Sequence, residues 1–261
     1  EGLVDIRERG GVYVRASLAG RTVTAAWPTK WLAEILADGL SRGIAAPDLA
    51  EMIRRSTETM RLRVAVISST DDQAAGLARE LREDFGLYAD GISATALAED
   101  ERAHRIALNR SDLLIATRGQ VELVQRLAAE FQKPCITIDV RTDFMMGEWA
   151  LLLRQPLWVI VATAEFGEML RRFMGKLRGI ENLHVLVHGI DDLEQIPANA
   201  ATYVTHRVRD LISGESIRGR VLPAARTISR ESAVEIFSFI VRSSAHAVDA
   251  LAQAHMATEM R

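Results

Sequence analysis

Residues 64–68 read Val64-Ala65-Val66-Ile67-Ser68, a continuous apolar run that is typical of a β-strand buried on both faces. A helical pattern follows over residues 73–85, where apolar side chains recur on one face. The alternation continues with strands expected at 91–97, 113–117 and 135–140 and helices at 99–108 and 120–131. Buried strands separated by helices predict a parallel sheet with helices on its faces.

The same alternation restarts in the second half of the chain. Strands are expected at 157–163, 183–188, 201–205 and 220–222, and helices at 166–177 and 207–212. Ser229 is expected to cap a long final helix. The sequence therefore predicts the α/β class, with two lobes that each contain a mostly parallel sheet flanked by helices. We place the first lobe at residues 61–152 and the second at 153–261.

Two shorter segments precede the lobes. Residues 1–26 contain a predicted β-hairpin, in which Gly10 and Gly11 can supply the positive φ of a tight turn. Residues 27–60 predict two connector helices: Trp31, Leu32, Ile35, Leu36 and Leu40 share one face, and Gly43 ends the first helix. Such helices pack on the next domain or on a partner subunit, and a role in relaying a signal is equally compatible with the pattern.

Composition excludes several classes of protein. No apolar run reaches the roughly 18 residues of a membrane-spanning helix, and the charged residues 1–10 do not form a secretory signal. We therefore expect a cytoplasmic protein that does not contact a membrane. The single cysteine, Cys135, excludes internal disulfides and multi-cysteine metal sites, and its place in an apolar strand predicts an inert thiol. The formal charge of −3 argues against nucleic-acid binding by the chain as a whole.

Sequence motifs of common enzymes and metal sites are also missing. The chain contains no GxSxG, no GxxxxGK[ST], no HExxH and no CxxC, and no GxGxxG follows the first strand of the first lobe. We therefore expect a protein that is not an enzyme and that uses no cofactor and no metal.

The N-terminal hairpin resembles a known DNA-binding element. A Gly2-Leu3-Val4 strand, a turn rich in arginine and glycine, and a Val12-Tyr13-Val14 strand resemble the wing of the winged helix-turn-helix domain in the GntR family of transcription regulators. The resemblance implies a homodimer that contacts DNA, here through Arg7, Arg9, Gly10 and Gly11. The helices that would read bases are not in the sequence, so we expect only a remnant of that domain. On pattern alone, an ordinary surface hairpin is the alternative.

Residues 61–261 resemble, in architecture and without a shared motif, the two-lobed periplasmic-binding-protein-like domains that the LacI family uses as sensors. The two usual GntR-family sensors, one all-helical and one built on a single antiparallel sheet, do not fit this alternation. The two resemblances together imply an effector-binding part of a bacterial transcription regulator. An α/β enzyme or a solute-binding protein that acts on a small metabolite is the alternative.

Candidate ligand-binding residues follow the strands, because ligands of parallel sheets lie beyond the carboxyl ends. The first lobe offers Ser69, Thr70, Asp71, Gln73, Thr117, Arg118, Arg141 and Asp143, and the second offers Thr163, Glu165, Phe166, His188 and His206. Helix caps, internal ion pairs and structural histidines are the alternatives for these residues. Arg118 and Arg141 favour an anionic metabolite as the ligand. The acidic candidates could instead bind hydroxyl or amine groups, so a sugar or an amino acid is also a possible ligand.

Overall fold

The structure is a computed structural model that describes residues 4–7, 11–14, 28–58, 62–140, 149–212 and 217–259. The chain divides into two compact units, residues 1–53 and residues 54–261. Within the part of the chain that is described, no helix is both long and apolar enough to cross a membrane.

The first unit contains a hairpin, one helix and most of a second helix. Strands β1 (Val4–Arg7) and β2 (Gly11–Val14) pair antiparallel, which agrees with the predicted hairpin. Helix α1 (Thr29–Ser41) ends just before Gly43, whose φ of 76° is the left-handed conformation expected at a helix end. Helix α2 (Ala46–Glu58) follows. The two helices approach closely at Gly39, where an added Cβ would lie 2.6 Å from Leu49 Cδ2.

The second unit contains a four-stranded parallel sheet in the order β4-β3-β5-β6. Its strands are β3 (Arg63–Ser68), β4 (Tyr88–Ser93), β5 (Leu113–Thr117) and β6 (Cys135–Ile138). Its helices are α3 (Asp71–Phe85), α4 (Ala94–Glu99), α5 (Glu101–Arg110), η1 (Arg118–Gln120) and α6 (Val121–Phe131).

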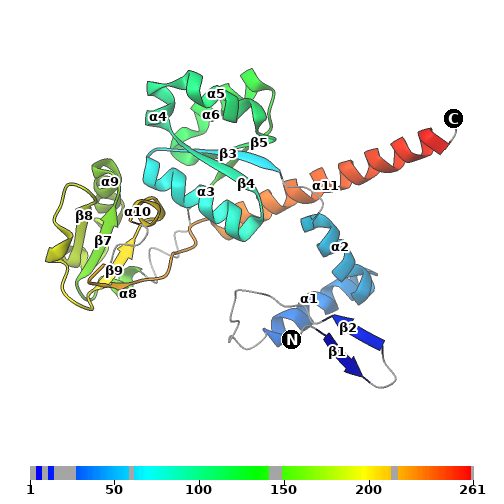
Figure 1. The fold of residues 1–261 in the computed structure, drawn as a ribbon, viewed down its shortest axis with the longest axis horizontal. Coiled ribbons are helices and arrows are strands. Elements are labelled where there is room, and N and C mark those ends of the chain that lie inside the picture. The colour runs from blue at the N-terminus through cyan, green and yellow to red at the C-terminus, as the bar shows by residue number, and fades with distance from the viewer. Residues whose placement is uncertain are drawn as a thin grey trace. The chain divides into compact units, whose positions relative to one another are not determined.

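Both faces of this sheet are covered, as the apolar strand predicts. Val64 and Val66 pack in one core cluster with residues of α3, whereas Ala65 and Ile67 pack in another with residues of α4, α5 and α6. Figure 1 shows α3 on one side of the sheet and α4, α5 and α6 on the other. Successive residues of a strand point to opposite faces, so one five-residue run contributes to two cores.

A second parallel sheet has the order β10-β9-β7-β8. Its strands are β7 (Leu157–Val161), β8 (Leu183–Val187), β9 (Ala201–Val204) and β10 (Arg220–Val221). Its helices are α8 (Ala150–Leu152), α9 (Ala164–Met174), η3 (Ile180–Asn182), η4 (Leu193–Gln195) and α10 (His206–Leu211). In both sheets the first strand lies between the second and the third, and the fourth lies beyond the third. The predicted two-lobed α/β fold is confirmed.

Two boundaries differ from the sequence-based expectation. The strand expected at 91–97 is β4, which ends at Ser93; the Ser93 hydroxyl accepts a hydrogen bond from Ala96 N at 3.1 Å, and this cap starts α4. The sequence pattern places the final helix, α11 (Arg230–Glu259), in the second lobe. Ile228, Ile236 and Ile240 instead pack in the core of the first sheet, so the chain returns to the first lobe at this point.

Candidate functional site

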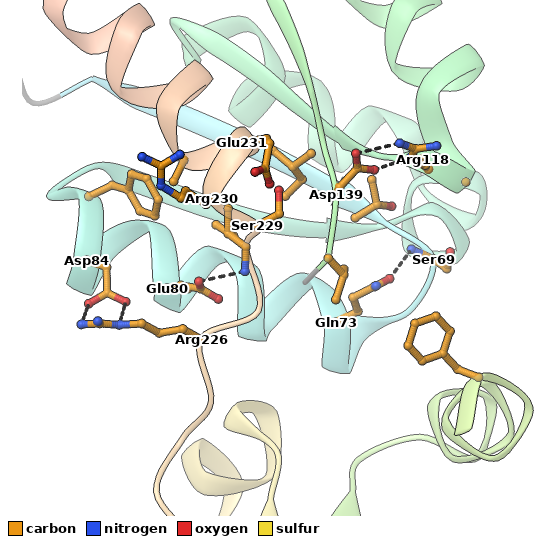
Figure 2. A pocket seen from close by; sticks show the side chains of 18 of the residues that line it. Ser69, Gln73, Glu80, Asp84, Arg118, Asp139, Arg226, Ser229, Arg230 and Glu231 are labelled. Atoms are coloured by element: carbon orange, nitrogen blue, oxygen red, sulfur yellow. Dashed lines mark hydrogen bonds and ion pairs between the residues drawn. The ribbon is translucent and has the colours of Figure 1, made fainter. Parts of the chain in front are cut away.

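A cavity of about 1360 Å³, which we call the main pocket, lies at the carboxyl ends of β3, β5 and β6 (Figure 2). It is bounded by α3, the start of η1, the start of α11, the segment that leads into α11, and Met169 and Phe173 of α9 (Ala164–Met174). Its polar lining residues are Ser69, Gln73, Glu80, Asp84, Thr117, Arg118, Asp139, Arg226, Ser229, Arg230 and Glu231. Polar groups thus converge where the topology of a parallel sheet places ligands.

Four of the residues predicted from strand ends line this pocket: Ser69, Gln73, Thr117 and Arg118. Ser69 and Gln73 are joined, because Ser69 N donates to Gln73 Oε1 at 3.4 Å. Gln120 Nε2 donates to Ser69 Oγ at 3.3 Å and so connects the loops after β3 and β5. Thr70 acts as the cap of α3: its hydroxyl accepts from Gln73 N at 3.4 Å, which is the alternative role that its position predicts.

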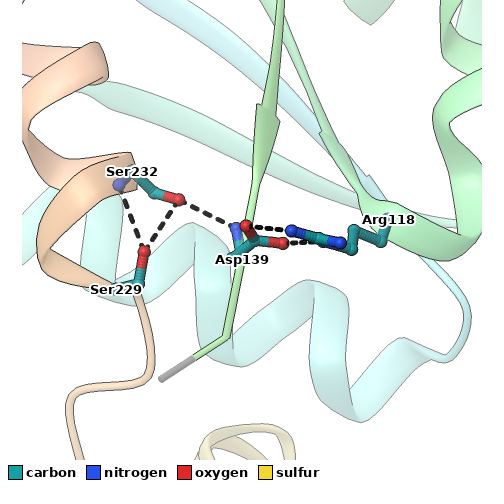
Figure 3. Close-up of polar contacts among 4 residues, drawn as sticks. All are labelled: Arg118, Asp139, Ser229 and Ser232. Atoms are coloured by element: carbon teal, nitrogen blue, oxygen red, sulfur yellow. Dashed lines mark hydrogen bonds and ion pairs between the residues drawn. The ribbon is translucent and has the colours of Figure 1, made fainter. Parts of the chain in front are cut away.

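Arg118 is paired with a carboxylate (Figure 3). Its Nε donates to Asp139 Oδ1, and its Nη2 donates to Asp139 Oδ2 at 2.8 Å. The hydrogen bond from Arg118 lowers the pKa of Asp139 below its ordinary value. Because each charge of this pair offsets the other, Arg118 differs from the unpaired anion clamp that its strand-end position suggests.

Asp139 was not a candidate from sequence, since the strand expected at 135–140 contained it. The strand β6 ends at Ile138, and the backbone of Asp139 forms hydrogen bonds with residues at the start of α11. Asp139 N donates to Ser232 Oγ at 2.8 Å, and Ser229 N donates to Asp139 O at 2.9 Å. Figure 3 shows Ser229 and Ser232 beside Asp139. Because Ser229, Arg230 and Glu231 line the main pocket, the start of α11 borders it.

The side of the pocket along α3 is held by two carboxylates. Glu80, which is buried, accepts hydrogen bonds from Thr227 N at 2.8 Å, Thr227 Oγ1 at 2.7 Å and Ile228 N at 3.0 Å. Asp84 accepts from Arg226 Nε at 3.0 Å and from Arg226 Nη2 at 2.9 Å. These contacts tie the segment before α11 to α3.

The two lobes are joined at Asp72, whose side chain is 2% exposed. Its carboxylate accepts from Ala162 N at 2.9 Å, Thr163 N at 2.9 Å, Thr163 Oγ1 at 3.0 Å and Thr205 Oγ1 at 2.6 Å. Thr163, a predicted ligand residue, therefore serves the junction, and its hydroxyl also accepts from Phe166 N at 3.3 Å as the cap of α9. The sequence position of Asp72 does not predict its contacts with the second lobe, because an aspartate in the first turn of a helix is common.

A second cavity of about 180 Å³, which we call the apolar pocket, lies between α3 and the helices α9 and α10. Three predicted residues, Gln73, Phe166 and His206, line it together with Asp72, Gly76, Leu77, Val140, Trp149, Met169, Leu170, Phe173, Tyr203, Thr205, Ala225 and Thr227. Burial lowers the pKa of His206, and the positive charges of Arg79 and Arg209 lower it further. Its ring is thus neutral at pH 7.

The other predicted residues lie elsewhere. Asp71 is exposed at the start of α3, and Glu165 lines a shallow depression of about 500 Å³ with Ser69 and Thr70. His188 follows the edge strand β8 and lines neither the main pocket nor the apolar pocket. Arg7 and Gly11 face each other across the β1–β2 ladder. The candidates Arg9, Gly10, Arg141 and Asp143 lie outside the described residues.

Among the described residues, no group of three or more His, Cys, Asp or Glu side chains is placed to hold a metal ion. Comparisons of the chain with protein-family models, with curated proteins and with solved structures found no match.

Proposed function

We propose that this chain is the effector-binding part of a transcription regulator and that it binds a small molecule in the main pocket. The observation that carries the proposal is convergence: the loops after β3, β5 and β6 and the N-terminus of α11 all open onto one cavity. Helix N-termini present unpaired N–H groups, which suit polar ligands.

The chemistry of the lining favours a hydroxyl-bearing or zwitterionic metabolite, such as a sugar or an amino acid, over a simple anion. The guanidinium of Arg118 already has a carboxylate partner in Asp139, so the pair offers both donors and acceptors. Hydroxyl groups of Ser69 and Thr117 and the amide of Gln73 add further neutral partners. A ligand with several polar groups of both kinds can satisfy this set.

The proposed output is a change in DNA binding. The β1–β2 hairpin, with its resemblance to a GntR wing, supports this part of the proposal. Dimerisation would match the two-fold symmetry of a DNA operator. The exposed apolar side chains of Trp31, Leu36 and Leu40 on α1 offer a surface for a second copy.

The test is a thermal-shift screen of sugars, polyols, amino acids and carboxylic acids, followed by calorimetry on any compound that stabilises the chain. We expect Arg118→Gln to weaken binding about tenfold or more, which corresponds to about 1.4 kcal/mol. The matched control is Arg126→Gln, since Arg126 is an exposed arginine on α6 that does not line the main pocket. Equal affinities of both variants and the parent would refute the site.

The regulatory part needs a separate measurement. A gel shift with residues 1–261, with and without the bound compound, is expected to show a change in the affinity for DNA. Residues 1–261 alone are expected to bind DNA weakly and without sequence preference, because a wing mainly contacts phosphates. Chemical turnover of the bound compound would instead favour the alternative, an α/β enzyme.

A further inference from the structure

The charged side chains that line the main pocket do not cancel. The lining contains three arginines and four carboxylates, which give a formal charge of −1: Arg118, Arg226, Arg230, Glu80, Asp84, Asp139 and Glu231. Two of the arginines, Arg118 and Arg226, are already paired with carboxylates of this set. Because opposite charges attract, the lining favours a ligand with a positive group over an anion.

Glu231 is the carboxylate of this set that is free to bind a positive group. It is exposed, and within the described part of the chain its side chain forms no hydrogen bond or ion pair, whereas the other three carboxylates each accept hydrogen bonds from residues of the chain. Figure 2 shows the Glu231 carboxylate on the side of α11 that faces Asp139 in this view, whereas Arg230 extends the other way. A helix N-terminus attracts anions, but here Glu231 already supplies that negative charge.

The apolar wall of the main pocket on the side of the second sheet comes from α9. Met169 and Phe173 lie four residues apart on this helix, and both also line the apolar pocket and the depression beside Ser69 and Thr70. Phe173 is 56% exposed, so a ligand can remove its ring from water, which is favourable. Aromatic rings and thioether sulfur both make favourable contacts with a bound ring. This wall therefore suits a large apolar group.

We propose that the main pocket binds a molecule with a primary ammonium group and a large apolar group. Glu231 accepts hydrogen bonds from the ammonium, and Met169 and Phe173 cover the apolar group. An ammonium has three N–H donors and no acceptor, so it suits a carboxylate, whereas a carboxylate ligand would meet like charge. The inference rests on the proposed sensing function and narrows the effector to one chemistry.

Two sources share this chemistry: a simple amine, and an amino acid with a large apolar side chain. Arg230 distinguishes them, because its guanidinium forms no ion pair within the described residues and can bind the carboxylate that only the amino acid carries. An effect of Arg230→Gln on the amino acid but not on the amine therefore identifies the amino acid as the class of effector.

The experiment measures, by calorimetry, the binding of four related probes to residues 1–261. The probes are 2-phenylethylamine, L-phenylalanine, 3-phenylpropionate, which lacks the ammonium, and L-alanine, which lacks the ring. We expect at least one of the first two to bind with a Kd below about 1 mM, and the last two to bind at least about tenfold more weakly. Glu231→Gln should weaken the tighter amine about tenfold and should not weaken 3-phenylpropionate.

Phe173→Ala tests the apolar wall and is expected to weaken the tighter amine about fivefold or more. The matched controls are Glu99→Gln, at an exposed carboxylate of α4, and Leu151→Ala, at a side chain of α8 that is 60% exposed. Neither residue lines the main pocket. All of these positions are exposed, so each variant is expected to fold, and circular dichroism checks this.

Three results would overturn the inference. Either 3-phenylpropionate or L-alanine could bind as tightly as the amines, the tighter amine could bind equally well to Glu231→Gln or to Phe173→Ala, or neither amine could bind. If one of these results occurs while another compound binds and Arg118→Gln weakens it, the inference is wrong and the proposed function stands. If no compound of any kind binds, both proposals fail.

Discussion

Asp72→Asn is expected to destabilise the second unit strongly, because Asp72 is the buried carboxylate that joins the two lobes. In the parent chain its two oxygens accept hydrogen bonds from three residues of the second lobe, Ala162, Thr163 and Thr205. Asparagine has nearly the same shape, but it carries no charge, and one of its oxygens is replaced by an NH₂ group. That NH₂ group would face N–H and O–H donors, so some of them would lose their acceptor.

The magnitude follows from the number and kind of these bonds. A hydrogen bond to a charged group contributes about 1.5–3 kcal/mol, and a buried donor without an acceptor costs about 1–3 kcal/mol. The individual values do not add, since neighbouring bonds are coupled. We therefore expect the free energy of unfolding to fall by about 3 kcal/mol, against a total of about 5–15 kcal/mol for a typical domain.

The neighbouring Asp71 provides the control, because it lies in the same helical turn and is exposed. Asp71→Asn loses only the favourable interaction of a carboxylate with the helix N-terminus, about 0.3–1 kcal/mol. Urea unfolding followed by circular dichroism and tryptophan fluorescence measures both variants. A loss below 1 kcal/mol for Asp72→Asn, or equal losses for the two variants, would refute the junction that we describe.

Three further outcomes are expected. Arg118→Gln removes the hydrogen bond that lowers the pKa of Asp139, so a carboxylate NMR titration should show this pKa rising. In the parent chain, the stability that the pair contributes is present at neutral pH. It is lost as the pH falls through the pKa of Asp139 in the folded state. Burial raises the pKa of the Cys135 thiol, so an aromatic disulfide reagent should react with Cys135 more slowly than with free cysteine at pH 7. The reaction with Cys135 should become faster as the pH rises. A rate equal to that of free cysteine at pH 7 would contradict this expectation. Gly91→Ala would place a Cβ 2.4 Å from the carbonyl oxygen of Ala74. Urea unfolding should therefore show that the free energy of unfolding falls by about 1–3 kcal/mol. An unchanged midpoint of the unfolding curve would count against this packing of β4 on α3.

Most of the architecture could be predicted from periodicity. The run at 64–68 is buried on both faces, and that property alone requires helices on each side of the sheet. The caps at Thr70, Thr163 and Ser229 were also visible in the sequence, because a short polar side chain before an apolar periodic stretch has a local cause. Local patterns of this kind need no knowledge of distant contacts.

The parts that could not be predicted depend on contacts between distant segments. The return of α11 to the first sheet changes which residues border the pocket, since it ends β6 at Ile138 and frees Asp139 to follow the strand. Ligand-binding residues are expected directly after a strand. When the strand is expected to extend to residue 140, this expectation points to Arg141 and Asp143 and not to Asp139. The role of Asp72 could not be predicted, because its hydrogen-bond partners lie about 90 and 133 residues further along the chain.

The central claim is that a small molecule binds where the loops after β3, β5 and β6 meet the start of α11. Hydrogen–deuterium exchange, measured with and without a compound found in the thermal-shift screen, tests this claim most directly. We predict slower exchange of backbone amides in residues 69–73, 117–120, 139–140 and 226–231, with little change in the exposed helix α5. Protection confined to α5, α6 or the far end of the second sheet, with unchanged exchange in those four segments, would contradict the claim.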